Sequence, residues 1–117
     1  MKIVEKNVAD LKPADYNPRE ITKKQYAEIK ESIGKFGLVD PLIVNIHPER
    51  KNILVGGHQR LQVIKGLGLK TAPTVEVNLD LKEEQELNVR LNKNQGQWNF
   101  DSLANFFDVD NLVDWGF

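Results

Sequence analysis

The sequence contains no cysteine, which excludes disulfide bonds, thiolate metal ligands and a cysteine nucleophile. Histidine is scarce as well, because His47 and His58 are the only two and lie far apart in the chain. No spacing of ligands indicates a zinc site, and we predict no metal-binding residue. Any chemistry must therefore come from other side chains or from the backbone.

An excess of positive charge is also missing. The chain carries 16 basic and 17 acidic residues, a formal net charge of −1. Proteins that bind DNA unassisted usually show a basic excess or stripe, so this balance disfavours direct DNA binding while leaving room for a local basic pocket. No apolar run approaches the ~20 residues that cross a bilayer, and the first residues lack the apolar core of a signal peptide. We expect a cytoplasmic protein without membrane contact.

The length of 117 residues suits one domain with a single hydrophobic core. Short apolar or alternating segments predict strands over 2–7, 41–46, 53–55 and 74–79, and the polar segment 47–52 predicts the turn between the second and third strands. The strands and the intervening helices show no regular βαβ rhythm. We therefore predict an α+β fold, a small mixed sheet with helices packed on it.

Three helices are predicted within this pattern. The first begins at Thr22, which forms a capping box with Gln25, and ends at Gly37. The second covers 58–67. The third begins after Asp80 and fades near 94–96, with Leu87 and Leu91 expected on its inner face.

The last twenty residues, 98–117, are rich in aromatic side chains. We expect helical structure over 100–107 and a short piece at 112–115, together forming a C-terminal helical extension of the same domain. Aspartates surround the aromatic residues, which disfavours stacking on nucleic acid bases and favours packing on the core or on a partner. The aromatic residues are Trp98, Phe100, Phe106, Phe107, Trp115 and Phe117.

A strand, two glycines and a helix follow one another at Gly56 to Arg60, an order that favours anion binding. Unpaired N–H groups and partial positive charge mark a helix start, and glycine allows a phosphate to approach the backbone. The guanidinium of Arg60 suits bidentate contact with phosphate, and His58 and Gln59 add donors. A plain strand-to-helix turn with an exposed arginine stays the alternative, since two glycines before a helix are common.

Four segments surround and include this turn: NPR at 17–19, SIGKFG at 32–37, LVDPLIV at 38–44 and ILVGGHQR at 53–60. Their order resembles the ParB/sulfiredoxin-like superfamily, and within it the ParB N-terminal domain, often labelled ParB-like nuclease, of the phage and plasmid type. The resemblance covers most of the chain and divides it into a nucleotide-binding domain at 1–97 and the extension at 98–117.

The resemblance implies that the domain binds CTP or ATP, usually with Mg²⁺. It places the phosphates over the segment from Gly57 to Arg60, with Gly56 beside it, and brings Arg19 near the nucleotide. Sulfiredoxins carry their reactive cysteine where His58 stands, so sulfinic acid reduction is excluded.

A later position departs from the family pattern. Partition proteins have a Glu-Asn pair that helps to hold triphosphate and metal, and it corresponds here to Lys93 and Asn94. Lys93 reverses the charge, which favours direct phosphate contact and weakens magnesium binding of the carboxylate kind.

Three functions stay open. The first is a nucleotide-binding module of a DNA-transaction protein that acts in partition, transcription regulation or DNA modification. The second is an NTPase or a phosphotransferase resembling free serine kinases, with Asp40 or Glu20 as base, although a turn position is favoured for Asp40 and a surface position for Glu20. The third, a metal-dependent nuclease, ranks last because no carboxylate cluster is present.

The expected partners follow from the first function. Nucleotide is the direct ligand. DNA contact would need a partner protein or a region beyond these residues, because the chain has no room for a helix-turn-helix region. The sequence does not decide which nucleotide binds, whether that nucleotide is hydrolysed, or whether the protein forms a homodimer.

Overall fold

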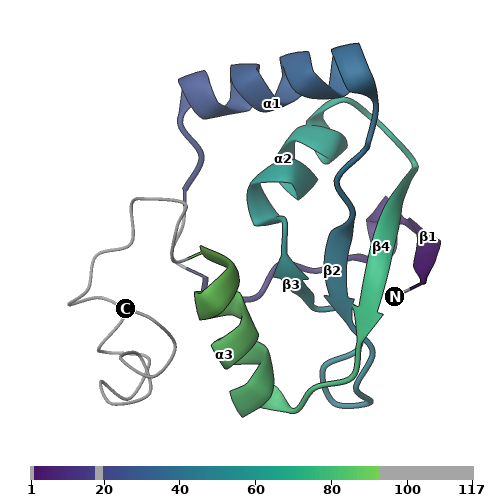
Figure 1. The fold of residues 1–117 in the computed structure, drawn as a ribbon, viewed down its shortest axis with the longest axis vertical. Helices are drawn as coiled ribbons and strands as arrows, with labels where there is room; N and C mark the ends of the chain where they lie inside the picture. Colours follow the sequence, from purple (N-terminus) through teal and green to yellow (C-terminus); the bar gives the residue numbers. More distant parts are fainter. Residues whose placement is uncertain (1, 18–19, 93–117) are drawn as a thin grey trace.

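The computed structural model describes residues 2–17 and 20–92. Within them, four strands form one mixed sheet in the order β1-β4-β2-β3 (Figure 1). The outer pairs β1–β4 and β2–β3 are antiparallel, and the central pair β2–β4 is parallel. The strands are β1 (Ile3–Asn7), β2 (Leu42–Asn45), β3 (Leu54–Gly56) and β4 (Thr71–Val77).

Three α-helices accompany the sheet. Helix α1 (Lys23–Phe36) packs on α2 (His58–Gly66), and α3 (Leu81–Asn92) packs beside β3 (Figure 1). A 3₁₀ turn, η1 (Val8–Asp10), follows β1 and contacts α2. The predicted α+β fold, a small mixed sheet with helices packed on it, is confirmed.

The local signals read from the sequence act as expected at two helix starts. At α1, the Thr22 hydroxyl accepts a hydrogen bond from the Gln25 N–H at 3.1 Å, and the Gln25 side chain accepts one from the Thr22 N–H at 3.0 Å. Asp80 and Glu83 form the same reciprocal pair before α3, at 2.8 and 3.2 Å. These bonds satisfy backbone donors that a helix start leaves unpaired.

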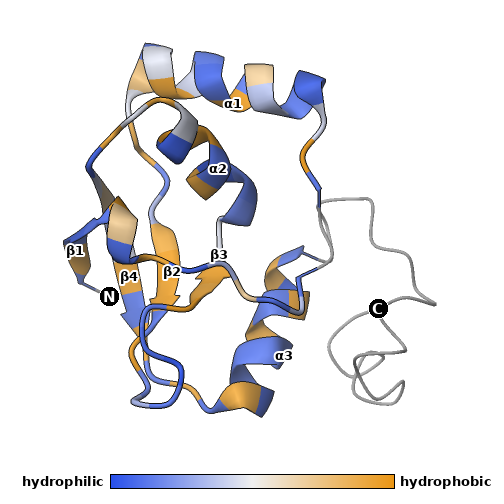
Figure 2. Cartoon of the chain, turned by 180° about the vertical axis from the view of Figure 1, so that it is seen from behind, coloured by the Kyte–Doolittle hydropathy of each residue, from blue (hydrophilic) through white to orange (hydrophobic). Residues whose placement is uncertain are grey.

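The core lies between the sheet and α2. Side chains from η1, the following loop, strands β2, β3 and β4 and helix α2 form one buried cluster, and Figure 2 shows that β2 and β3 consist mainly of hydrophobic residues. Helix α1 contributes no fully buried side chain and rests on this core through Ile33. The cluster contains Val8, Leu11, Leu42, Val44, Leu54, Leu61, Ile64 and Ala72.

Two predictions need correction. Strand β4 begins at Thr71 rather than at Thr74, because β1 pairs along its first residues and Pro73 precedes the point where β2 joins. The inner face of α3 was expected to carry Leu87 and Leu91, which are only partly buried. The fully buried side chains of α3 are instead mostly polar: Glu84, Asn88, Val89 and Asn92.

No helix in the described part of the chain is long and apolar enough to cross a membrane. The helical extension expected over 98–117 lies outside the described residues.

Candidate functional site

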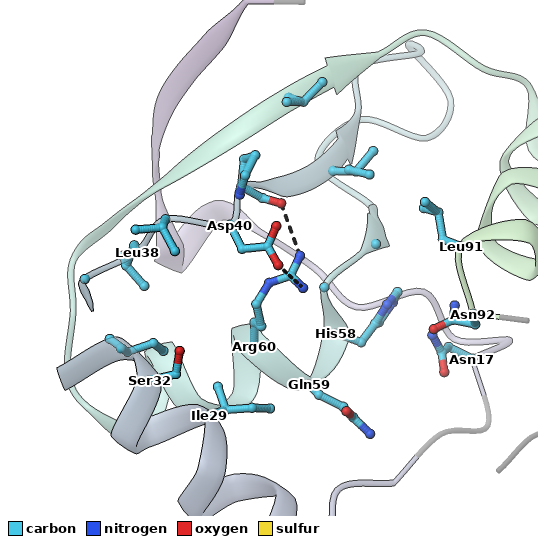
Figure 3. Close-up of a pocket in the computed structure, with 18 residues that line it drawn as sticks. Asn17, Ile29, Ser32, Leu38, Asp40, His58, Gln59, Arg60, Leu91 and Asn92 are labelled. Atoms are coloured by element: carbon cyan, nitrogen blue, oxygen red, sulfur yellow. Dashed lines mark hydrogen bonds and ion pairs between the residues drawn. The ribbon is translucent and has the colours of Figure 1, made fainter. Parts of the chain in front are cut away.

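A cleft of about 770 Å³ opens where β2 begins, β3 ends and α2 begins (Figure 3). Helix α1 and the loop after it form one wall, and the end of α3 forms another. The volume falls in the range of roughly 300–1,000 Å³ that is usual for small-molecule sites. The structure brings six of the predicted site residues together in its lining: Asp40, Gly56, Gly57, His58, Gln59 and Arg60.

Gly57 starts α2 in a conformation that only glycine adopts easily, with φ 92° and ψ 25°. A Cβ at this position would lie 2.5 Å from Leu42 Cδ2 and 2.9 Å from Arg60 Nη2. A Cβ at Gly56 would lie 2.9 Å from Leu91 Cδ1. The two glycines thus allow the tight turn and the close approach of the guanidinium, and they leave the first N–H groups of α2 at the edge of the cleft.

The guanidinium of Arg60 lies at the cleft rather than in the core. Its Nη2 donates a hydrogen bond to the Pro41 carbonyl at 3.1 Å, and its Nη1 forms an ion pair with Asp40 Oδ2 at 3.3 Å (Figure 3). Its Nε is buried and has no hydrogen-bond partner among the described residues. Arg60 is therefore held in one place, with a carboxylate on one of its edges.

His58 connects α2 to the loop before α1. Its Nε2 accepts a hydrogen bond from the Ala14 N–H at 3.1 Å, so this nitrogen carries no proton in that contact. Asn17, three residues after Ala14, lines the cleft beside His58 (Figure 3). The loop thus closes one end of the cleft.

Among the cleft residues that the sequence analysis did not name as site residues are two asparagines, Asn17, which belongs to the NPR segment at 17–19, and Asn92. Asn92 is buried and donates to the Asn88 carbonyl at 2.7 Å, while Asn88 donates to the Val55 carbonyl at 2.9 Å. The signal for Asn92 was its spacing of four from Asn88 and of eight from Glu84, which puts three polar residues on one face of α3. This polar pattern was not used in the sequence analysis, because the inner face was assigned from Leu87 and Leu91.

The remaining predicted residues are not placed in the cleft. Glu20 is exposed and is not part of the lining. Arg19, Lys93 and Asn94 lie outside the described residues.

Near the cleft, Glu84 of α3 is the centre of a buried polar network. Its carboxylate accepts hydrogen bonds from the Tyr16 hydroxyl at 2.8 Å, from Asn45 Nδ2 at 2.8 Å and from Arg50 Nε and Nη2 at 3.1 and 2.9 Å. Burial alone would raise the pKa of Glu84, but these hydrogen bonds and the charge of Arg50 outweigh it, so the pKa lies below its ordinary value. Burial and the bond to Glu84 raise the pKa of Tyr16.

The network holds no cation site. Among the described residues, no group of three or more histidine or carboxylate side chains is arranged to hold a metal ion. Glu84 instead joins the β2–β3 hairpin and the loop at Tyr16 to α3, and both this loop, through Asn17, and α3 contribute residues to the cleft.

The mixed four-stranded sheet and the glycine-started helix at the cleft define the class of the domain. Residues 1–95 match the model of the ParB N-terminal domain, and the chain belongs to that family.

Two curated proteins are similar in sequence to this chain. Stage 0 sporulation protein J of Bacillus subtilis is 36% identical over 78 residues, in a match that covers 62% of this chain and 26% of that protein. A probable chromosome-partitioning protein ParB of Campylobacter jejuni is 30% identical over 101 residues, 86% of this chain and 36% of that protein. The chain thus spans between about a quarter and about a third of the length of these relatives.

Solved structures show the same fold. The chromosome-partitioning protein ParB of Caulobacter crescentus, complexed with CTP-γ-S, superposes with a TM-score of 0.70 at 22% identity, covering 93% of this chain and 62% of that one. A second structure of that protein, complexed to the centromeric parS site, gives a TM-score of 0.69 at 18% identity over 96% and 63% of the two chains. The chain is therefore a ParB-like domain related to chromosome-partitioning proteins.

Proposed function

We propose that this domain binds a nucleotide in the cleft between α1, α2 and α3, with CTP as the first candidate and ATP as the second. The observation that carries the proposal is the position of Arg60. Its guanidinium lies over Gly57, at the start of α2, and is fixed by the Pro41 carbonyl at 3.1 Å. A guanidinium next to helix N–H groups suits the oxygens of a phosphate chain.

The rest of the cleft suits the uncharged part of a nucleotide. Ile29 and Ile33 of α1, with Leu38 and Val39 of the following loop, line the side of the cleft that faces α1. Apolar side chains can cover a base or ribose while a few polar groups fix its orientation. In this arrangement Gln59, His58 and Gly56 lie at the phosphate end, and Asn17 and Asn92 add side-chain amides. Arg19, Lys93 and Asn94 are kept as further phosphate contacts on the family resemblance, with Mg²⁺ as a further component.

We further propose that the domain is the nucleotide-binding module of a DNA-transaction protein of plasmid or phage type, acting in partition, transcription regulation or DNA modification. The names of its relatives support a role in partition, and the Caulobacter relative is complexed with a CTP analogue in one structure and with parS DNA in another. A nucleotide that binds one state of the domain better shifts its conformational or dimerisation equilibrium towards that state.

A catalytic role is less well supported. Asp40 and Glu20 are the candidate bases for an NTPase or phosphotransferase, but Asp40 forms an ion pair with Arg60 and Glu20 lies outside the cleft lining. We therefore place nucleotide binding before nucleotide turnover.

The test is a calorimetric titration of the protein with CTP, ATP, ADP and GTP, with and without Mg²⁺. We expect binding of at least one nucleotide in the micromolar to millimolar range. Arg60→Ala should weaken it by about tenfold or more, since a charge-assisted contact is lost. Arg90→Ala is the matched control, because Arg90 is paired with Glu86 on the exposed side of α3 and its loss should leave affinity unchanged. No heat and no thermal shift with all four nucleotides would refute the proposal.

A further inference from the structure

Asp40 and Pro41 hold the Arg60 guanidinium from two sides. The Pro41 carbonyl accepts from Nη2 at 3.1 Å, and the Asp40 carboxylate lies 3.3 Å from Nη1 (Figure 3). The first contact comes from the backbone and the second from a side chain. Because the two contacts use different nitrogens, Arg60 can lose one of them and keep the other.

The contact with Asp40 is the more replaceable of the two. The Asp40 side chain is 71% exposed, whereas that of Arg60 is 28% exposed. An ion pair so open to solvent is weak, because water and salt screen it and the carboxylate loses side-chain freedom when it forms. The bond to Pro41 needs no such ordering of a side chain, since the loop backbone already fixes the carbonyl.

The Asp40 carboxylate occupies one of the donor nitrogens that an anionic ligand at Arg60 would use. Asp40 and Arg60 both line the cleft, and a guanidinium binds carboxylate and phosphate oxygens in the same way. A phosphate group at Nη1 therefore competes with the carboxylate for the same nitrogen. A carboxylate that stays nearby would repel the negative charges of the ligand.

We propose that Asp40 is an internal competitor for the anionic ligand at Arg60, an inference that rests on the proposed nucleotide site. The carboxylate neutralises Arg60 in the empty cleft and moves into solvent when the phosphates bind. It thereby lowers the affinity for every ligand that Arg60 contacts. Binding is then strong only for ligands that also use the rest of the cleft, which makes Asp40 a residue that sets specificity without touching the bound ligand.

The experiment is a titration of Asp40→Asn and of the wild-type protein with CTP and, separately, with inorganic pyrophosphate, without Mg²⁺. Asparagine keeps the shape of the side chain and removes its charge. We expect Asp40→Asn to bind both probes about two- to fivefold more tightly, the size expected when an exposed ion pair no longer competes. The gain should shrink in 0.5 M salt, where screening has already weakened the pair in the wild-type protein.

Glu86→Gln is the matched control. Glu86 also forms an exposed pair with an arginine, Arg90, at 3.0 Å, so this substitution removes the same charge from a similar pair on α3. Its affinity for both probes should equal that of the wild-type protein. Thermal melts of both variants establish that they are folded.

The outcomes separate the two proposals. If the wild-type protein binds CTP but Asp40→Asn binds equally or more weakly, the competitor role is wrong and the nucleotide site stands. The CTP titration is repeated with Mg²⁺, and if Asp40→Asn then binds more weakly than the wild-type protein, the carboxylate acts on the metal ion and the competitor role is also wrong. If neither protein binds either probe or any nucleotide, the nucleotide site fails and the role of Asp40 fails with it.

Discussion

Gly57 is the residue on which the geometry of the cleft most depends. Its φ of 92° turns the chain from β3 into α2, and the space where its Cβ would stand is occupied by Leu42 and by the guanidinium of Arg60. Two separate constraints therefore act at one position, a backbone conformation and a close approach of side chains. Either constraint alone disfavours any residue with a Cβ.

The two constraints can be separated by comparison with Gly68. Gly68 also has a positive φ, 71°, but a Cβ there would have no atom within 4 Å. We expect Gly68→Ala to lower the free energy of unfolding by about 1 kcal/mol through backbone strain alone. Gly57→Ala should cost about 2 kcal/mol or more and should also weaken nucleotide binding, since Arg60 must move. Urea unfolding measures both changes, and equal losses in the two variants would contradict the steric argument.

Helix α1 has clear start and stop signals in its own sequence, but it buries none of its side chains fully. It has a capping box at Thr22 and ends at Gly37, and Phe36 at its end is 67% exposed. Tyr26 reaches α2 at Gly66, where a Cβ would overlap the tyrosine hydroxyl. The contact between α1 and α2, which also shapes one wall of the cleft, therefore requires a glycine on α2.

Two glycines within these helices should respond to alanine in opposite directions. Gly34 of α1 is exposed and has open space at the Cβ position, so Gly34→Ala should raise the free energy of unfolding by about 0.5–1 kcal/mol through helix propensity. Gly66→Ala offers the same gain in propensity but displaces Tyr26, and it should destabilise the protein. Thermal or urea unfolding of both variants measures the two changes in the free energy of unfolding. A Gly66→Ala protein more stable than the wild type would show that Tyr26 is not held against α2.

The helices also show which features of the fold can be predicted from the sequence and which cannot. Helix α1 and the turn at Gly56 and Gly57 were predicted well, because caps, stops and apolar spacing depend on residues close in the chain. The inner face of α3 was predicted only in part, since Leu91 lies against Gly56 of β3 but the most deeply buried residues are others. Its buried Glu84 and Asn88 are satisfied by residues 33 to 68 positions away in the chain, and no local pattern reveals such partners. The pair between Asp40 and Arg60 was missed for the same reason.

At the scale of the whole molecule, Glu84 joins three segments that are distant in the chain. Tyr16 belongs to the loop before α1, Asn45 and Arg50 to β2 and the turn after it, and Glu84 to α3. The carboxylate is fully buried, while the Arg50 side chain keeps 21% of its surface exposed. Removing one partner of a buried ion pair leaves the other without compensation, which costs more than the pair itself contributes. The position of α3 relative to the loop at Tyr16 and the β2–β3 hairpin therefore depends on one ionised side chain.

The ionisation of Glu84 should make the stability of the fold depend on acid pH. The pKa of Glu84 in the folded protein lies below its unfolded value of about 4.3, so the unfolded chain binds the proton more readily. The ionised carboxylate therefore stabilises the fold fully above about pH 4.3. This stabilisation is lost as the pH falls through the pKa of the folded protein. Glu84→Gln should lower the free energy of unfolding at pH 7 by about 2–4 kcal/mol, and the difference from the wild-type protein should narrow towards pH 3. Glu76→Gln breaks the surface pair with Lys6 instead and should cost less than about 1 kcal/mol. Urea unfolding from pH 3 to pH 7 measures all three proteins. If the difference in the free energy of unfolding between Glu84→Gln and the wild-type protein stays constant over this range, packing rather than the charge of Glu84 holds the three segments together.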